Sequence, residues 1–373
     1  MPCVIWVVSN VSMKQWMEGK RMNDRVQWID VSKGIGIFLV IIGHTMIQGE
    51  LRGQIYAFHM PLFFFISGYL FSNRRYPQIK QFVLAKARTI LIPYISFSII
   101  SIVLMKIFQG GVIDFSSLIR SFLLSERNGI YFNQPLWFLT SLFTIEVIFY
   151  LLIKYIKKQF YMMLLVTAMS CFSVSVLDAV AGTKILPWSF DQSLYFLFYF
   201  AMGYRMKLTA SRRANGTIKK SPLFMVSAVL YLLFLMDGKI YAKIFQIAIG
   251  ETWHLHDYLF LYLNNIVWAM IAIHFIIYVS QFLSLSFLQY LGKNSLILLA
   301  LHVSLGFNII NRFGASSLQA IFHQPNLLGL IYTILTIILL IPVITLINKY
   351  FPCILGRKKE RKTDKTSNTK NNG

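Results

Sequence analysis

The first long apolar stretch of the chain carries three ionisable side chains, Asp30, Lys33 and His44. Burying such a group in a membrane costs several kcal/mol, so it usually serves a function. Lys33 and His44 are eleven residues apart, which on a helix is three turns plus about 20° and about 16 Å along the axis. One helix face would then present a cation for an anionic group at one end and an imidazole, a possible general base, at the other.

The spacing alone leaves a structural alternative open for the same residues. Lys33 could extend its ammonium group to the membrane interface, with Asp30 one turn away as its partner. His44 could simply cap the helix near the outer surface. The pattern therefore indicates a candidate site without choosing between these two interpretations.

Three further ionisable residues lie in later apolar segments. His59 enters the second segment from the outer side and is expected at a depth similar to that of His44. Glu146 lies in the middle of its segment, where it could orient a histidine, contact a hydroxyl or make a helix-to-helix hydrogen bond. His302 is expected about 12 Å into its segment from Asn294.

Composition and charge decide what kind of element must position these residues. Of the 373 residues, 56% are apolar and 13% are charged, against about 25% charged in soluble domains. The apolar residues form blocks of about 20, the length that crosses about 30 Å of hydrocarbon. We expect an all-α, polytopic integral membrane protein with about ten transmembrane helices, at roughly 29–48, 55–72, 89–107, 136–154, 160–178, 187–206, 222–237, 257–279, 295–312 and 326–349.

The positive charge indicates an orientation in the membrane. The formal net charge is +22, but most Lys and Arg residues fall in alternate loops, which is the pattern of cytoplasmic segments rather than of nucleic-acid binding. This predicts a multi-pass protein of the cell membrane with both termini in the cytoplasm and no nucleic-acid partner. Lys86 and Arg88, just before the third predicted helix, fit ordinary anchoring on that side.

The predicted domain organisation is simple. Residues 1–24 form a cytoplasmic tail, 25–350 the transmembrane domain, and 351–373 a basic tail expected to be disordered and attracted to anionic lipid headgroups. The three cysteines are too few and too scattered for a zinc site or a disulfide framework. The histidines of the outer loops show no metal-ligand pattern, so no metal is expected.

Six sequence blocks occur in the order seen in the acyltransferase-3 family of membrane O-acyltransferases, which act on surface glycans. The match covers about residues 25–310 and is most similar to the fucose 4-O-acetylase-like branch. The blocks are RVQWIDVSKGIGIFLVIIGHT, FHMPLFFFISGYLF, KARTILIPY, PLWFLTSLF, FYFAMGYRM and YLGKNSLILLALHV.

The resemblance implies roles for the candidate residues. His44 would serve catalysis, with His59, Glu146 and His302 as further members of the catalytic site. Basic residues on the cytoplasmic side hold acyl-coenzyme A in the family, which here points to Lys33, Lys86 and Arg88. Lys33 stands where an arginine is commoner, which keeps the charge but not the bidentate grip on phosphate. Trp137 could stack on the sugar acceptor, or anchor its helix at the interface.

The resemblance also implies the reaction. We expect a membrane O-acetyltransferase that moves an acetyl group from cytoplasmic acetyl-CoA to a hydroxyl of a cell-envelope or exported sugar, such as capsule, exopolysaccharide, O-antigen or a lipid-linked precursor. Acetyl-CoA is a co-substrate, and no bound cofactor is expected. His44 would act as general base or carry the acetyl group itself. The alternatives are an exporter of a glycan or lipid-linked sugar, and a sensor or scaffold that would tolerate loss of both His44 and Lys33.

Overall fold

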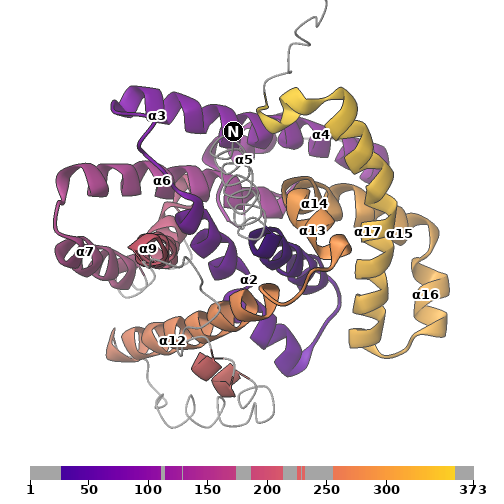
Figure 1. The fold of residues 1–373 in the computed structure, drawn as a ribbon. Coiled ribbons are helices and arrows are strands. Elements are labelled where there is room, and N and C mark those ends of the chain that lie inside the picture. Colours follow the sequence, from indigo (N-terminus) through magenta and orange to yellow (C-terminus); the bar gives the residue numbers. More distant parts are fainter. Residues whose placement is uncertain are drawn as a thin grey trace, which may run out of the picture.

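A computed structural model of the protein describes residues 27–110, 114–127, 129–173, 186–212, 225–227, 229–231 and 255–357. Every regular element in these ranges is helical (Figure 1). The α-helices are a first helix at 27–43, then α2 (Gly49–Leu70), α3 (Ile79–Lys86), α4 (Ile92–Gln109), α5 (Phe115–Leu124), α6 (Trp137–Tyr155), α7 (Gln159–Phe172), α9 (Phe190–Arg212), α12 (Leu255–Ser280), α13 (Ser286–Lys293), α14 (Ser295–Leu301), α15 (Asn308–Phe313), α16 (Ala315–Ile321) and α17 (Pro325–Tyr350).

Short turns of other helix types join several of these elements. Two are π-helical, η1 (Ala87–Leu91) between α3 and α4 and η6 (His302–Phe307) between α14 and α15. Three are 3₁₀ turns, η2 (Gln134–Leu136), η4 (Pro187–Ser189) and η7 (Pro352–Leu355). Because the π-turns continue the helices around them, α3–α4 and α14–α15 each run as one long helix.

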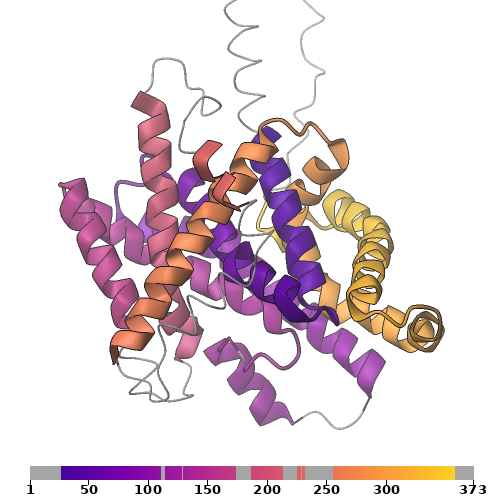
Figure 2. The same ribbon diagram turned by 90° about the horizontal axis from the view of Figure 1, so that it is seen from below.

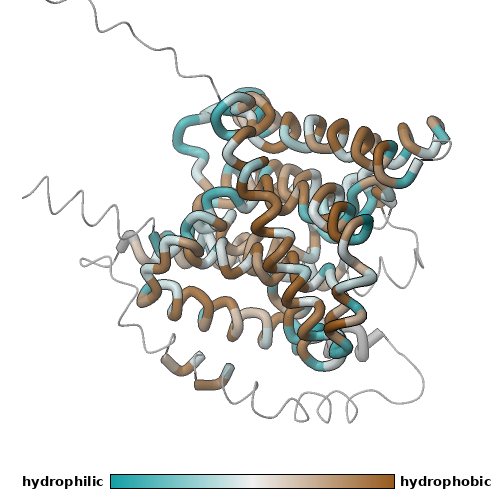
Figure 3. Tube along the Cα trace, turned by 90° about the vertical axis from the view of Figure 1, so that its right-hand side faces the viewer, coloured by the Kyte–Doolittle hydropathy of each residue, from teal (hydrophilic) through white to brown (hydrophobic). Residues whose placement is uncertain are grey.

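The described residues contain five helices long and apolar enough to cross a membrane, at Ile79–Gln109, Gln134–Tyr155, Leu263–Ser280, Ser295–Phe313 and Pro325–Tyr350. The all-α membrane class is therefore confirmed, whereas the number of about ten spans is not. Most of the predicted seventh helix, 222–237, and the end of the fifth lie outside the described residues. Figure 3 shows hydrophobic colour along most helices and hydrophilic colour mainly at their ends and connections.

Two predicted helix starts are wrong, for one physical reason. Helix α2 begins at Gly49 rather than 55, and the third long helix begins at Ile79 rather than 89. Both added stretches are polar or amphipathic: residues 49–53 are exposed, and Phe82 is the buried residue of α3. The apolar runs marked only the part of each helix that can contact hydrocarbon, so the polar turns were missed.

Helix α2 lies at the centre of the molecule and packs against α9. In Figures 1 and 2, α7 and α9 lie on one side and α15 to α17 on the other, with the first helix and α2 between them. A Cβ on Gly68 would collide with the Phe200 carbonyl, and one on Gly203 with the Phe65 carbonyl. Glycine at both positions therefore lets the two backbones touch, as small residues do between membrane helices.

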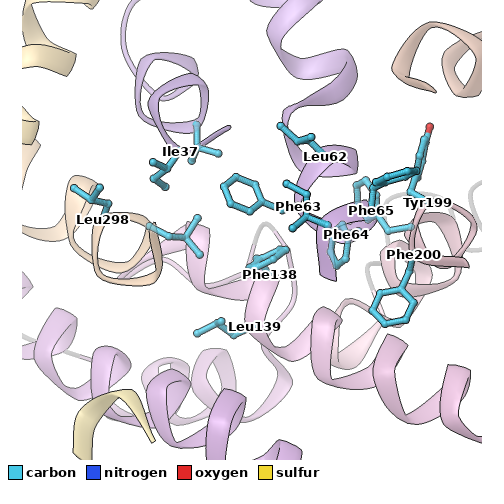
Figure 4. Packing of buried hydrophobic residues seen from close by; sticks show 14 of the residues in the cluster. Ile37, Leu62, Phe63, Phe64, Phe65, Phe138, Leu139, Tyr199, Phe200 and Leu298 are labelled. Atoms are coloured by element: carbon cyan, nitrogen blue, oxygen red, sulfur yellow. The ribbon is translucent and has the colours of Figure 1, made fainter. Parts of the chain in front are cut away.

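Aromatic side chains fill the space around α2. Phe64 stacks on Phe196 of α9 with ring centroids 4.5 Å apart and contacts Phe138 of α6 at 4.9 Å. Figure 4 shows Phe63 and Phe64 directed from α2 toward Phe138 of α6. This packing fixes the position of α2 along its axis, and with it the position of His59.

Candidate functional site

His44 lies in a turn just beyond the first helix and is half-buried. It was predicted to lie within a helix reaching residue 48, but the helix ends at 43. Two hydrogen bonds from other helices hold this turn: Tyr56 Oη of α2 donates to the Gly43 carbonyl at 2.8 Å, and the Gln48 amide donates to Asn326 Oδ1 of α17 at 2.9 Å. The His44 amide also donates to the carbonyls of Val40 and Ile41 in the first helix, so its own helix and neighbouring helices hold the turn together.

His302 lies against His44, with ring centroids 5.1 Å apart. The side chain is fully buried, and its Nδ1 is 2.9 Å from the carbonyl oxygens of both Leu298 and Leu299. Nδ1 must carry the proton to donate there, so Nε2 holds a lone pair. Nε2 has no hydrogen-bond partner within the described residues. A fixed acceptor is therefore available beside the His44 ring.

A change of helix type begins at His302. Residues 302–307 form the π-helical turn η6, which packs Gly306 closely against Thr336 of α17. Single π-turns inside α-helices are often found at functional sites, because they turn side chains out of the regular register. Nothing in the apolar pattern of this segment signals the turn.

His59 is the third histidine of this region and is buried in α2. Its Nδ1 donates to the Ile55 carbonyl at 2.7 Å, and its ring meets Tyr56 edge-on at 5.1 Å. It lies close enough to His44 for the two to interact electrostatically. We call His44, His59 and His302 the histidine cluster. The structure thus brings His44 near both His59 and His302, three of the residues that the sequence analysis assigned to catalysis.

Lys33 lies near the other end of the first helix and lines two cavities. The first, which we call the charged cavity, has a volume of about 570 Å³. It is lined by Asp30, Lys33, Gly292, Lys293, Asn294, Ser295, Leu296, Asn348 and Arg357. Three cations and one carboxylate thus surround a space large enough for a sizeable anionic group.

The second cavity, which we call the apolar pocket, has a volume of about 180 Å³. It shares Lys33, Ser295 and Leu296 with the charged cavity, so the two meet at Lys33. Its other lining residues are Met60, Phe63, Ser67, Thr89, Ile90, Phe138, Leu139, Leu142 and Leu299. Met60 is next to His59 in the chain and Leu299 bonds His302 through its carbonyl. The apolar pocket therefore extends from Lys33 toward the histidine cluster.

Glu146 and Lys86 pair with each other. Lys86 Nζ is 2.7 Å from Glu146 Oε2, and the carboxylate is buried. The ammonium also lies over the rings of Phe71 and Phe82, at 5.9 and 5.6 Å from their centroids. Neither residue lines the two cavities. The pair joins α3 to α6, which fits the helix-to-helix contact left open for Glu146, whereas a contact of Lys86 with phosphate stays a prediction.

Arg88 and Trp137 also lie apart from the cavities. Arg88 is exposed on η1 and lines neither, although the next residue, Thr89, faces the apolar pocket. Trp137 is buried at the start of α6 and stacks on Phe196 at 5.9 Å. The guanidinium of Arg127 lies 5.6 Å from its ring centroid. Trp137 thus lies within the aromatic packing, and Arg127, which covers one side of its ring, belongs to a loop predicted to face outward.

Sequence reasoning missed the polar residues that complete the site. Lys293 and Arg357 are among the many basic residues of the loops, and no pattern in the sequence marks Asn294 or Asn348. Asn133 is buried and donates to Ser101 Oγ at 2.7 Å and to the Ala300 carbonyl at 2.6 Å, which fixes the helix that bears the third histidine. Within the described ranges, no group of three or more His, Cys, Asp or Glu residues is placed to hold a metal ion.

Comparison with known proteins gives one match. The family model of the acyltransferase-3 domain, described as an acyltransferase domain, matches residues 26–347. No curated protein and no solved structure matches the chain.

Proposed function

Because this chain belongs to the acyltransferase-3 family of membrane acyltransferases, we propose that it moves an acetyl group from cytoplasmic acetyl-CoA to a hydroxyl of a cell-envelope or exported sugar. One observation carries the proposal. Lys33 stands where the charged cavity meets the apolar pocket, and that pocket leads to the residues beside the histidine cluster. A donor with an anionic head, a long uncharged arm and a reactive end would fit this arrangement. Its head would lie in the charged cavity, its arm in the apolar pocket and its reactive end beside the histidine cluster.

The donor is proposed to enter from the cytoplasmic side. The residues of the charged cavity lie at helix ends whose neighbouring segments are rich in Lys and Arg, which supports a cytoplasmic location. The phosphates of coenzyme A would remain among these cations, while its pantetheine arm passes Lys33 into the apolar pocket. The arm is uncharged, so an apolar lining does not penalise it as it would penalise a phosphate.

The chemistry follows from the placement of His44. An acceptor hydroxyl attacks the thioester carbonyl while His44 takes the hydroxyl proton as general base. The C–S bond then breaks, and the leaving thiolate takes the proton back from the imidazolium, giving the acetyl ester and free coenzyme A. His302 Nε2 can accept a hydrogen bond from the His44 ring, which would keep the opposite ring nitrogen of His44 unprotonated and directed at the hydroxyl.

The acceptor is proposed to approach from the outer side. The turn at His44 and the loop that carries Arg127 lie in segments predicted to face outward. The family relationship and the uncharged hydroxyl chemistry support a sugar, in the manner of the fucose 4-O-acetylase-like branch. Trp137, with one side of its ring below Arg127, is the proposed acceptor contact. The two substrates would then meet at His44 from opposite sides, which suits modification of glycans at the cell membrane.

Transfer can be tested with the purified full-length protein in lipid nanodiscs. Acetyl-CoA with a radiolabelled acetyl group is mixed with a panel of hexose, deoxyhexose and N-acetylhexosamine oligosaccharides, and labelled sugar is counted. Donor-dependent labelling of at least one sugar, absent with His44→Ala, is the expected result. If the wild-type protein moves a sugar across proteoliposomes and labels none, the exporter alternative is right instead.

A further inference from the structure

Three cations from distant parts of the chain surround the charged cavity. Lys33 belongs to the first helix, Lys293 ends α13, and Arg357 follows η7. The single carboxylate, Asp30, is electrostatically coupled to Lys33 and Lys293. Neither Lys293 nor Arg357 forms an ion pair within the described part of the chain. The cavity thus holds more positive than negative charge before any ligand enters.

A chain of amide hydrogen bonds fixes Arg357 at this cavity. Its Nη1 donates to Asn348 Oδ1 at 3.2 Å, and Asn348 Nδ2 donates to Asn294 Oδ1 at 2.8 Å. Asn294 Nδ2 in turn donates to the Tyr290 carbonyl at 2.8 Å. These contacts use part of the guanidinium and leave its other N–H groups for a ligand. An otherwise exposed arginine is thereby held in one place.

The backbone after α17 folds back to bring Arg357 there. The turn η7 buries Leu355, and Gly356 follows with φ of +67°. This left-handed conformation is strained for residues with a Cβ, and a Cβ here would also collide with the Arg88 carbonyl of η1. The part of the predicted tail up to residue 357 is therefore folded against η1.

We propose that Lys293 and Arg357 form a second cationic subsite that binds phosphate groups at the nucleotide end of coenzyme A. The inference rests on the proposed donor. Coenzyme A carries a diphosphate and a separate sugar phosphate, more negative charge than Lys33 alone can balance. Arginine and lysine are the side chains that bind phosphate most readily in proteins. Asn348 and Asn294 act as positioning residues for Arg357.

The test measures coenzyme A binding by calorimetry to the full-length protein in nanodiscs. Lys293→Gln and Arg357→Gln remove one charge each, and Arg357→Lys keeps the charge without the planar fork. Lys349→Gln is the matched control, because Lys349 is an exposed cation at the end of α17 that lies over Tyr350 and does not line the cavity. S-acetyl-pantetheine, which has the arm of acetyl-CoA but none of its phosphates, is the control ligand.

Each Gln variant should weaken coenzyme A binding by about 3- to 10-fold, as expected for a charge contact that remains partly open to water. The loss should shrink at high salt, and Arg357→Lys should recover part of it. Lys349→Gln should bind coenzyme A like the wild type, and S-acetyl-pantetheine should bind all variants equally.

Two results would overturn the subsite and separate it from the proposed function. If the wild type binds coenzyme A and both Gln variants match it within about twofold, the subsite is wrong and the donor assignment stands. Equal weakening of S-acetyl-pantetheine would mean that the variants disturb the fold rather than a phosphate contact. If the wild type binds no coenzyme A, the proposed function fails and the subsite fails with it.

Discussion

Replacing His44 by alanine tests the centre of the proposed mechanism. The side chain lies half-buried in a turn and its ring contacts that of His302, so its loss should leave the packing of the helices intact. Removing a general base typically lowers the rate by about 10²- to 10⁴-fold, equivalent to about 3–5 kcal/mol in the activation barrier. His44→Ala should lose turnover by that factor while coenzyme A binding stays near the wild-type value.

The role of His302 predicts how a second substitution combines with the first. His302→Asn keeps an N–H near Nδ1 for the carbonyls of Leu298 and Leu299 but removes the Nε2 acceptor beside His44. Its effect on turnover should be smaller than that of His44→Ala. In the double variant the loss should equal that of His44→Ala alone, because a positioning residue has nothing left to position.

The assay is acetyl transfer at saturating donor, with coenzyme A binding measured on the same preparations. His274→Ala is the control, because His274 makes a similar Nδ1 contact, 2.7 Å from the Met270 carbonyl, but lies against Phe65 rather than His44. It should turn over like the wild type. If His44→Ala keeps more than about a tenth of wild-type turnover, His44 is not the base. His59 would then be the leading candidate.

Three other predictions concern the scaffold. Lys86→Met should lower the free energy of unfolding by about 3 kcal/mol, because it leaves Glu146 buried without its partner. The double variant Lys86→Met/Glu146→Leu should recover most of that loss. An unchanged melting temperature of Lys86→Met in detergent would contradict the pairing. Gly292→Val should reduce both membrane abundance and coenzyme A binding, because its side chain would collide with the backbone of the first helix, whereas Gly53→Val meets open space and should change neither. A single cysteine at Asn73 should resist an impermeant thiol reagent on intact cells and react after permeabilisation, and labelling of intact cells would reverse the predicted orientation.

The fold class could be predicted because it depends on local composition. Blocks of apolar residues with few charges are enough to indicate membrane helices, and the structure confirms that class. The start of α3 could not be found in this way, because its turns bury one side, around Phe82, and expose the rest. The first helix ends at 43, where the Gly43 carbonyl accepts from Tyr56 of the next helix and the Gln48 amide donates to Asn326 near the other end of the chain, contacts that no local pattern contains.

The candidate site was predictable only where its residues share one helix. The spacing of Lys33 and His44 predicted opposite ends of one helix; in the structure Lys33 lies on the first helix beside two cavities, and His44 lies in the turn just after that helix, in the histidine cluster. The contact between His44 and His302 depends on how α14 and η6 pack, so no local pattern contains it. For the same reason, the pairing of Lys86 with Glu146 could not be foreseen from either segment.

The charged cavity joins the beginning of the chain to its end, and this has a consequence for biosynthesis. About 260 residues separate Lys33 from Lys293, so at about 5–20 residues per second the ribosome needs roughly 13–50 s to supply the later wall. During that interval the first helix is already in the membrane, and Asp30 is the nearby counter-charge of Lys33. The face of this helix that α13 later covers is still exposed. The surface around Gly34, which packs against the Leu288 backbone of α13, is open to the membrane insertion machinery until α13 arrives. A ribosome that stops before residue 357 would release a chain whose earlier helices are complete and whose cavity still lacks Arg357.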